Sequence, residues 1–306
     1  MAIAVAFSAC NPSSSTASGG ASSDKVQLEI HLAPAQVFKQ VTKTTQVSEQ
    51  KMMGMATKIS QEMQMYLRNE VESVDASGTS TIRCTYERVV VSMDNNMSGM
   101  QSYDSDKAEG SPAAPFQGYA ALVHQRIGYR MDKHGTILEV MGVDSLMDNV
   151  MRSVGADVEG PEMEGLKNTL KSTFGNEAMK SMMQSASIQY PEALIGVGDT
   201  WNKKIASMGA IPMAVDATYK VDHMDAEKVV LSFKGTITTD KEKAMDLGVA
   251  AISMDLKGDY EGTSEISRKT GLVLKSTVQQ DIDGSMGTMG MTIPMRIDQK
   301  ITVEGY

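Results

Sequence analysis

Residues 289–298 read MGMTIPMRID, a stretch in which large apolar residues alternate with small or polar ones. The apolar positions are Met289, Met291, Ile293, Met295 and Ile297. Because successive side chains of a β-strand point to opposite faces, this alternation predicts a strand with one buried face and one hydrated face. A sheet that is dry on one side and wet on the other is typical of antiparallel folds.

The same period-two pattern recurs along the chain and predicts further strands. It is found in residues 25–32, 62–68, 79–93 and 231–237. Turn signals stand between such runs at residues 75–78, 132–135 and 268–271. Short turns between alternating runs predict hairpins, so we expect a β-rich protein of antiparallel strands.

Helical spacing of apolar residues is confined to the middle of the chain. It predicts helices over residues 144–152, 161–173 and 175–186, which we expect to pack on the sheet. Residues 95–118 predict a long surface loop, and residues 241–253 are ambiguous between a loop and a short helix.

Two pairs of hairpins resemble each other. The segment 71–89 is similar to 219–237, and the hairpin around 132–135 is similar to the one around 268–271. We interpret this as a degenerate duplication within one domain, residues 25–306. Its halves would be 25–143 and 196–306, joined by a helical segment over 144–190. A regular β-meander without duplication is the alternative.

Composition limits the classes of function. The 306 residues carry a net charge of -9, which argues against nucleic-acid binding. No apolar run approaches the roughly 20 residues of a transmembrane helix. Aromatic residues make up only 5% of the chain, whereas methionine is unusually frequent at 26 residues.

The chain begins MAIAVAFSAC, and residues 11–24 are rich in Ser and Gly. Small residues followed by Cys10 resemble the lipobox of bacterial lipoproteins. The resemblance implies lipidation of Cys10, residues 1–10 as the remnant of a signal peptide and residues 11–24 as a flexible tether. Asn11 in place of Asp favours the outer membrane, facing the periplasm. The departures are the short apolar run and the absence of Lys or Arg before Cys10. They put the start codon in doubt, and an accidental cysteine is the alternative.

Reaction sites are not evident in the sequence. The four histidines are dispersed, and the zinc, nucleophile-elbow and dinucleotide motifs are absent. Cys84 alternates with polar residues, which favours a small buried strand residue over a nucleophile. We therefore expect no enzyme activity, no catalytic residue, no metal site and no cofactor.

Methionines cluster at residues 52–65 and 286–295. Three interpretations stay open: ordinary core packing, a deformable apolar groove for a lipid or another hydrophobic ligand, and Cu(I) binding through thioethers. Period-two spacing puts alternate side chains about 7 Å apart, which disfavours a shared metal. The residues predicted to face a ligand are Met53, Met55, Met63, Met65, Met289, Met291 and Met295.

Several segments together resemble a bacterial lipoprotein family of unknown function. They are Cys10 with its tether, QMYLRNEVESVDASGTSTIRCTYERV (64–89), YRMDKHGTILEV (129–140), YPEALIGVGDTW (190–201) and GDYEGTSEISRKTGLVLKSTVQQDIDG (258–284). The resemblance implies an α+β fold, a strongly curved antiparallel sheet with helices against its concave side. Such half-barrels are similar to those of cell-envelope lipoprotein carriers.

These observations predict a membrane-anchored, non-enzymatic lipoprotein that binds a lipid or hydrophobic small molecule on a Met-lined concave face. The alternative is a structural or protein-interaction module of the cell envelope without a small ligand.

Overall fold

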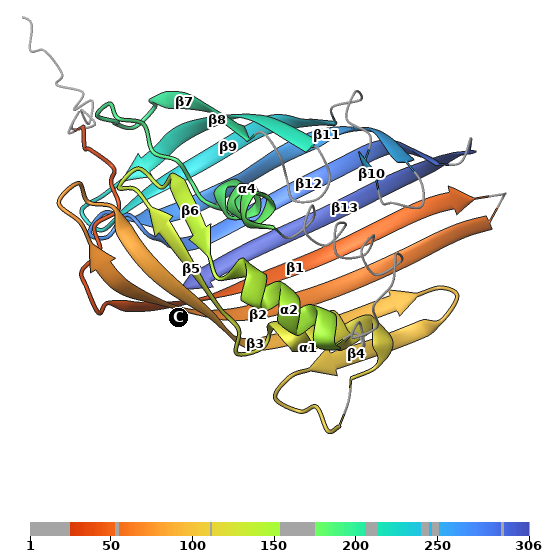
Figure 1. The fold of residues 1–306 in the computed structure, drawn as a ribbon. Coiled ribbons are helices and arrows are strands. Elements are labelled where there is room, and N and C mark those ends of the chain that lie inside the picture. Colours follow the sequence, from red (N-terminus) through yellow and green to blue (C-terminus); the bar gives the residue numbers. More distant parts are fainter. Residues whose placement is uncertain are drawn as a thin grey trace, which may run out of the picture.

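The computed structural model describes residues 25–52, 55–110, 112–153, 175–205, 213–239, 245–246, 251–288 and 291–305. Its main feature is a single sheet of 13 antiparallel strands, curved into an open half-barrel (Figure 1). The α+β, β-rich fold with a strongly curved, half-barrel-like sheet is therefore confirmed.

Neighbouring strands follow the order β6-β5-β3-β2-β1-β13-β12-β11-β9-β8-β7, with β4 paired to β3 and β10 to β11. The strands on the N-terminal side are β1 (Val37–Met52), β2 (Met55–Val74), β3 (Ser80–Asn95), β4 (Gly99–Asp104), β5 (Arg126–Met131) and β6 (Ile137–Met141). The others are β7 (Thr200–Ile205), β8 (Met213–Met224), β9 (Lys228–Thr239), β10 (Met245–Asp246), β11 (Ala251–Ser267), β12 (Val273–Thr288) and β13 (Met291–Gly305).

The chain enters this sheet in its middle. Strands β1 to β6 run outward to one edge, the helical segment crosses over, and β7 to β13 run back from the other edge until β13 pairs with β1. The two predicted halves thus occupy the two sides of the sheet. Their origin by duplication stays an interpretation.

The described helices are short: η1 (Ala114–Phe116), α1 (Gln117–Leu122), α2 (Val143–Ser153) and α4 (Asn176–Ala186). They lie on the concave side of the sheet, where α4 packs on β6 and α1 packs on α2 and β3 (Figure 1). The helices predicted over 144–152 and 175–186 are confirmed. The helix predicted over 161–173 lies outside the described residues.

The N-terminal segment 25–36 closes one end of the half-barrel. Its backbone bonds to several turns at that end: Val26 bridges Ile195, the Ile30 amide donates to Lys133 and the His31 amide donates to Thr270. The strand predicted over 25–32 is therefore wrong. Its alternation reflects burial of Leu28 and Ile30 under the strand ends, because an extended plug also points alternate side chains in opposite directions.

Two further predictions about loops need correction. Within the loop predicted over 95–118, β4, η1 and α1 form, because this segment folds back against β3. Within 241–253, neither alternative holds for the described residues: β10 pairs with the start of β11.

Some glycines of the sheet stand where the backbone of a neighbouring strand leaves no room for a side chain. A Cβ added at Gly258 of β11 would lie 2.1 Å from the Asp281 carbonyl oxygen, and one added at Gly284 of β12 would lie 2.0 Å from the Asp255 carbonyl oxygen. Such contacts leave no room for a larger residue, and glycines of this kind are typical of the bends in curved sheets.

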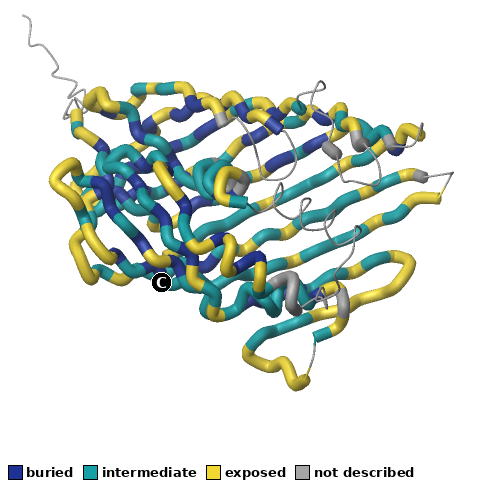
Figure 2. Tube along the Cα trace, in the orientation of Figure 1, coloured by how far each residue is buried: buried dark blue, intermediate teal, exposed yellow. Residues whose placement is uncertain are grey.

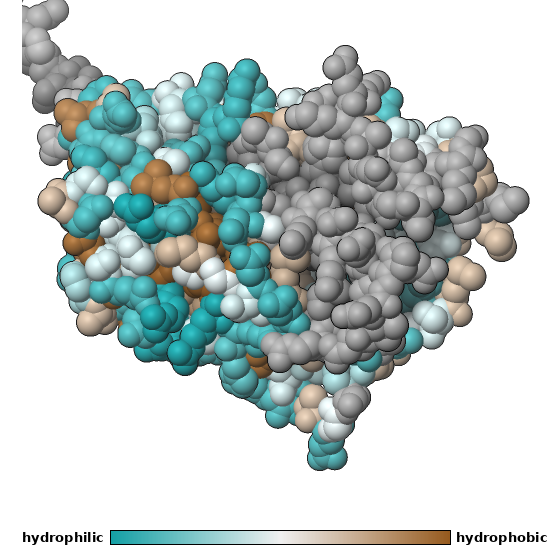
Figure 3. Space-filling view, viewed as in Figure 1, coloured by the Kyte–Doolittle hydropathy of each residue, from teal (hydrophilic) through white to brown (hydrophobic). Residues whose placement is uncertain are grey.

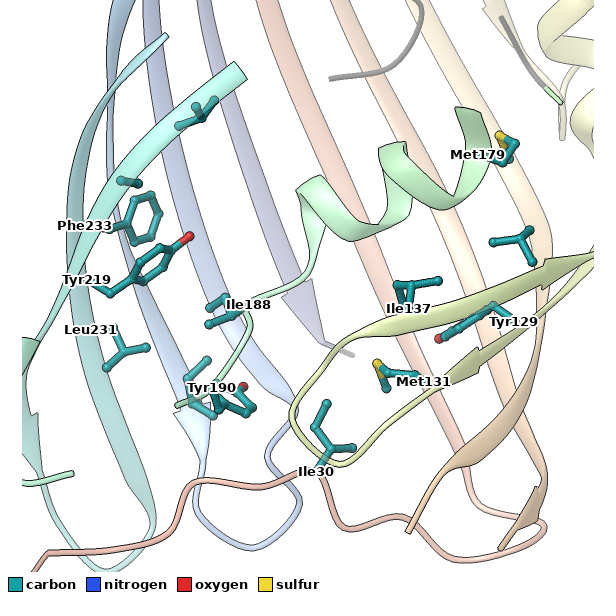
Figure 4. Close-up of a cluster of buried hydrophobic side chains, with 14 of the residues drawn as sticks. Ile30, Tyr129, Met131, Ile137, Met179, Ile188, Tyr190, Tyr219, Leu231 and Phe233 are labelled. Atoms are coloured by element: carbon teal, nitrogen blue, oxygen red, sulfur yellow. The ribbon is translucent and has the colours of Figure 1, made fainter. Parts of the chain in front are cut away.

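Buried residues are concentrated at the closed end and along β8, β9 and β11 (Figure 2). The larger core joins strand residues such as Tyr129, Leu231 and Phe233 to Met179 of α4 and to Ile188 and Tyr190 after it (Figure 4). Toward the other end, β1 and β13 carry half-buried side chains on the same face. The closed end is thus a packed core, and the concave face continues beyond it.

Candidate functional site: the concave face of the sheet

Alternation divides the side chains of each strand between the concave and the convex face. In β8, buried and exposed residues alternate strictly from Met213 to Lys220. The cross-strand register carries this division from strand to strand, so residues far apart in sequence form transverse rows. Neighbouring rows on one face lie about 7 Å apart along the strands.

On the described strands, charge is confined almost entirely to the convex face. Ion pairs join its neighbouring strands: Lys43 and Lys275 with Glu304, Lys228 with Glu265, and Lys234 with Glu261. On the concave face, the described strands carry apolar, hydroxyl and amide side chains, with Lys203 as the one charged residue. An uncharged inner face suits an uncharged or apolar occupant, because a buried charge would lose its hydration.

An aromatic row crosses the β7 side of this face. Ring centroids lie 5.4 Å apart for Trp201 and Tyr219, 5.0 Å for Tyr219 and Phe233, and 5.2 Å for Phe233 and Tyr260. The Trp201 indole donates to the Gln189 carbonyl at 3.1 Å, which fixes one end of the row. Figure 4 shows Tyr219 and Phe233 directed toward the segment that follows α4. This part of the face is filled.

A row of four glutamines crosses the middle of the concave face. The register pairs Gln280 of β12 with Gln299 of β13, Gln299 with Gln46 of β1, and Gln46 with Gln61 of β2. The Gln299 amide nitrogen donates to Gln46 Oε1 at 3.1 Å, and that of Gln61 donates to the Tyr119 hydroxyl at 3.0 Å. We call this row the glutamine belt. The sequence interpretation missed it, because its members lie up to 253 positions apart.

The aromatic row and the glutamine belt are in contact at one end of the belt. Tyr260 is the cross-strand neighbour of Gln280, and its hydroxyl shares a hydrogen bond with Tyr219. Gln280 itself is 2% exposed, and its amide makes no hydrogen bond with any other residue that the structure describes. Buried amides usually have partners, so Gln280 is a group with unused bonding capacity.

Apolar rows flank the belt on both sides. Toward the closed end lie Phe233, Val278, Ile301, Met63 and Val91. Toward the other end lie Ile237, Ile282, Ile297 and Ile59, followed by Met213, Leu256 and Met295, and then by Met254, Met286 and Ile293. Along β12 and β13 the face therefore changes from apolar to amide and back to apolar, whereas β1 carries Thr44, Ser48 and Gln50 in the flanking rows.

Lys203 of β7 is 4% exposed and points onto the concave face. Its ammonium donates to the backbone carbonyls of Gln184, at 3.3 Å, and Ser187, at the C-terminal end of α4. Cations are favoured at this end of a helix. Burial lowers the pKa of Lys203 to about 8. Lys203 thus connects β7, at the edge of the sheet, to the C-terminal end of α4 through hydrogen bonds.

The predicted methionines are spread over the concave face and do not form one group. Met63 and Met65 pack with Val89, Val91 and Phe116 under η1 and α1. Met295 is half-buried against the larger core, whereas Met55 and Met291, at 63% and 42% exposed, stand near the strand ends opposite the closed end. Met53 and Met289 lie outside the described residues.

The two cysteines have separate places. Cys84 faces the core at 5% exposed, and burial raises its pKa to about 12, which disfavours the reactive thiolate. Cys10, the predicted lipidation site, lies outside the described residues, as do the whole signal remnant and tether.

A shallow polar cleft of about 410 Å³ lies at the closed end, beside the ion pair of Glu29 and Lys133. His134 lines it, and its Nδ1 is buried without a hydrogen-bond partner. Among the described residues, no three His, Cys, Asp or Glu side chains are grouped to hold a metal. In the part of the chain that the structure describes, no helix is long and apolar enough to span a membrane. The described surface seen in Figure 3 is mainly hydrophilic, with apolar residues gathered near β6 and α4.

Comparison with known families identifies one match. Residues 77–273, more than half of the 306, match the family of unknown function DUF6263. The chain belongs to this family. The matched region of this DUF6263 protein runs from the turn before β3 to the start of β12, so it includes Tyr260 but none of the four belt glutamines.

No curated protein matches the sequence. Among solved structures, the chain is similar to lipovitellin, from a study of lipid–protein interactions, at 9% identity and a TM-score of 0.46, covering 90% of this chain and 25% of that one. An outer membrane channel from Pseudomonas putida F1 matches at 7% identity and a TM-score of 0.24, covering 90% and 97%. OccK7 of Pseudomonas aeruginosa matches at 6% identity and 0.22, covering 88% and 99%. The DUF6263 chain spans only a quarter of the lipovitellin chain. The function proposed below rests on this chain's own residues.

Proposed function

We propose that this DUF6263 protein is a non-enzymatic, membrane-anchored lipoprotein of the cell envelope that binds a lipid or another hydrophobic molecule on its concave face. The observation that carries the proposal is the separation of charge between the two faces of the sheet. Charged side chains cover the convex face, whereas the described concave strand positions carry only one, Lys203, which is engaged by α4.

Methionine supports the same proposal. Beyond the packed end, the concave face carries Met254, Met286, Met291 and Met295 among branched aliphatic residues. Unbranched thioether side chains re-pack around ligands of different shape more readily than aromatic ones. The partial exposure of Met295 and Met291 leaves apolar surface that a hydrophobic ligand would cover.

Anchoring and location rest on the N-terminal sequence. Cys10 after small residues, followed by the polar stretch 11–24, would attach the half-barrel to a membrane through a lipidated cysteine, in the outer membrane facing the periplasm. Mass spectrometry of protein from the native cell would detect the acyl groups on Cys10. An unmodified Cys10 would refute the anchor and leave the ligand proposal in place.

Neighbouring threonines of β1 provide a matched test of ligand binding. Thr44 faces the concave side between Ile301 and Met63, and Thr45 is exposed on the convex side. The full chain should take up the neutral fluorophore N-phenyl-1-naphthylamine. Thr44→Lys should abolish uptake because it places a charge on the uncharged face, and Thr45→Lys should retain it. Melting curves of both variants check the fold. Absence of uptake by the unmodified protein, or equal uptake by both variants, would contradict the proposal.

A further inference from the structure

The glutamine belt divides an apolar face with a line of uncharged hydrogen-bonding groups. Gln280, Gln299, Gln46 and Gln61 are consecutive neighbours across four strands. Each primary amide offers two donor hydrogens and one acceptor oxygen. The hydrogen bonds within the belt and to Tyr119 use one donor of Gln299, one donor of Gln61 and the oxygen of Gln46. Most of the bonding capacity of the belt is therefore not used by the residues that the structure describes.

Gln280 gives the strongest indication of a ligand. Its side chain is buried at 2% exposed, yet its amide makes no hydrogen bond to any described residue. An amide that makes no such bond keeps its donor hydrogens and its acceptor oxygen for a partner from outside the sheet. A polar group on a bound molecule would satisfy it.

We propose that the belt holds the uncharged polar group of an amphipathic ligand, of the chemical class of a neutral acylglycerol. This inference rests on the function proposed above. Ester carbonyls accept hydrogen bonds from amide nitrogens, and glycerol hydroxyls both donate to amide oxygens and accept from amide nitrogens. The belt thus matches this headgroup with both kinds of bond.

Charge on this face argues against an ionic headgroup. A carboxylate or phosphate at the belt would find no unengaged cation on the described concave strands, because Lys203 there already donates to the carbonyls of Gln184 and Ser187. A quaternary ammonium would find no carboxylate on the described concave strands. An unpaired buried ion is strongly disfavoured, whereas a neutral ester or hydroxyl is not.

The flanking rows fit the apolar part of the same ligand. Three rows on the side away from the closed end carry Ile, Leu and Met side chains, at about 7 Å a row along the strands. Three rows span roughly 20 Å, which exceeds the roughly 15 Å thickness of one leaflet of a bilayer's hydrocarbon core. An acyl chain would lie along these rows with its headgroup at the belt.

Competition among ligands with the same sixteen-carbon chain tests the proposal on the full-length protein. The competitors are 1-monopalmitoylglycerol, palmitate, hexadecyltrimethylammonium and hexadecane. The affinity of each is measured by its ability to displace bound N-phenyl-1-naphthylamine. We expect 1-monopalmitoylglycerol to bind about tenfold more tightly than the other three, since each hydrogen bond to the belt contributes about fivefold to tenfold.

Two adjacent glutamines of β12 supply the variant and its control. Gln280→Leu should reduce the preference for 1-monopalmitoylglycerol over hexadecane about fivefold to tenfold, and Gln280→Leu with Gln46→Leu should abolish it. Gln279→Leu, on the convex face, should leave the preference unchanged. Melting curves of Gln280→Leu and Gln279→Leu check that both variants fold, since leucine fills similar space to glutamine in each case.

A measurement on the unmodified protein makes the test independent of the variants. The ester carbonyl stretch of carbonyl-13C-labelled 1-monopalmitoylglycerol should move to lower wavenumber on binding, as hydrogen bonding requires. An unshifted stretch, or equal binding of hexadecane or palmitate, would overturn the belt proposal while apolar binding stands. If the fluorophore is not taken up and none of the four ligands binds, the proposed function itself fails.

Discussion

Replacing Lys203 by methionine should change how the stability of the protein depends on pH. Lys203 is buried on β7 and donates to the carbonyls of Gln184 and Ser187. Methionine is also unbranched and fills similar space, but it carries no proton. The substitution removes the titration of this site together with its two hydrogen bonds.

The magnitude follows from the pKa of Lys203. Burial lowers it from 10.5 to about 8, so between these values the unfolded chain binds a proton that the folded protein does not. The free energy of unfolding of the unmodified protein therefore rises with pH in this window and falls as pH drops through 8. At about 1.4 kcal/mol per pKa unit, the full effect is about 3 kcal/mol, of which about 2.5 kcal/mol falls between pH 7 and 10.

Urea unfolding at pH 7, 8, 9 and 10, followed by far-UV circular dichroism, measures this effect. The stability advantage of the unmodified protein over Lys203→Met should grow by about 2.5 kcal/mol from pH 7 to pH 10. Buried tyrosines such as Tyr129 and Tyr190, whose pKa values burial raises, titrate alike in both proteins and cancel in the difference. Lys204→Met is the control, because Lys204 is the next residue and its side chain is 81% exposed. A difference between unmodified protein and Lys203→Met that stays constant from pH 7 to pH 10 would refute the reasoning.

Two further predictions concern the sheet itself. Gly258→Ala should lower the free energy of unfolding by about 1–3 kcal/mol, since the added Cβ would lie 2.1 Å from the Asp281 carbonyl oxygen. Gly118→Ala in α1 should have little effect, because no atom lies within 4 Å of the added Cβ. Chemical denaturation of both variants measures the difference. Asp281→Asn should raise stability at neutral pH by about 0.2–1 kcal/mol, less in high salt, because Asp281 faces Asp298 across β12 and β13. Partial burial and the neighbouring Asp298 raise the pKa of Asp281, so the free energy of unfolding of the unmodified protein falls as pH rises through that pKa. The stability gain of Asp281→Asn should therefore vanish in acid, where Asp281 is protonated. A gain that persists in acid would contradict this account.

Most of the strands were predicted from the alternation of apolar and polar residues with a period of two. Residues 291–298 and 80–93 form strands because a strand that is wet on one side and dry on the other needs that pattern in any antiparallel sheet. The same rule failed at 25–32, where an extended plug buries Leu28 and Ile30 without joining the sheet. Alternation reports which side of an extended segment is buried, and tertiary packing decides whether another strand pairs with it.

The methionines illustrate a second limit. Met63, Met65 and Met295 lie on the inner face, and their role in facing a ligand stays a prediction. Their spacing could not distinguish a packed site from an open one. Met63 and Met65 lie under η1 and α1, while Met291 is exposed. Coverage depends on segments remote in sequence that fold over the strand, so the strand itself holds no signal for it.

The sequence by itself determined the β-rich class, the hairpins and the division of each strand into an apolar and a charged face, because these follow from local alternation and turn chemistry. Only the tertiary structure decided that Gln46, Gln61, Gln280 and Gln299 form one row and that Lys203 is buried against the end of α4. In sequence each of these residues is a single polar residue within an alternating strand. Register and curvature bring them together, and both are set by pairings between strands that are distant along the chain.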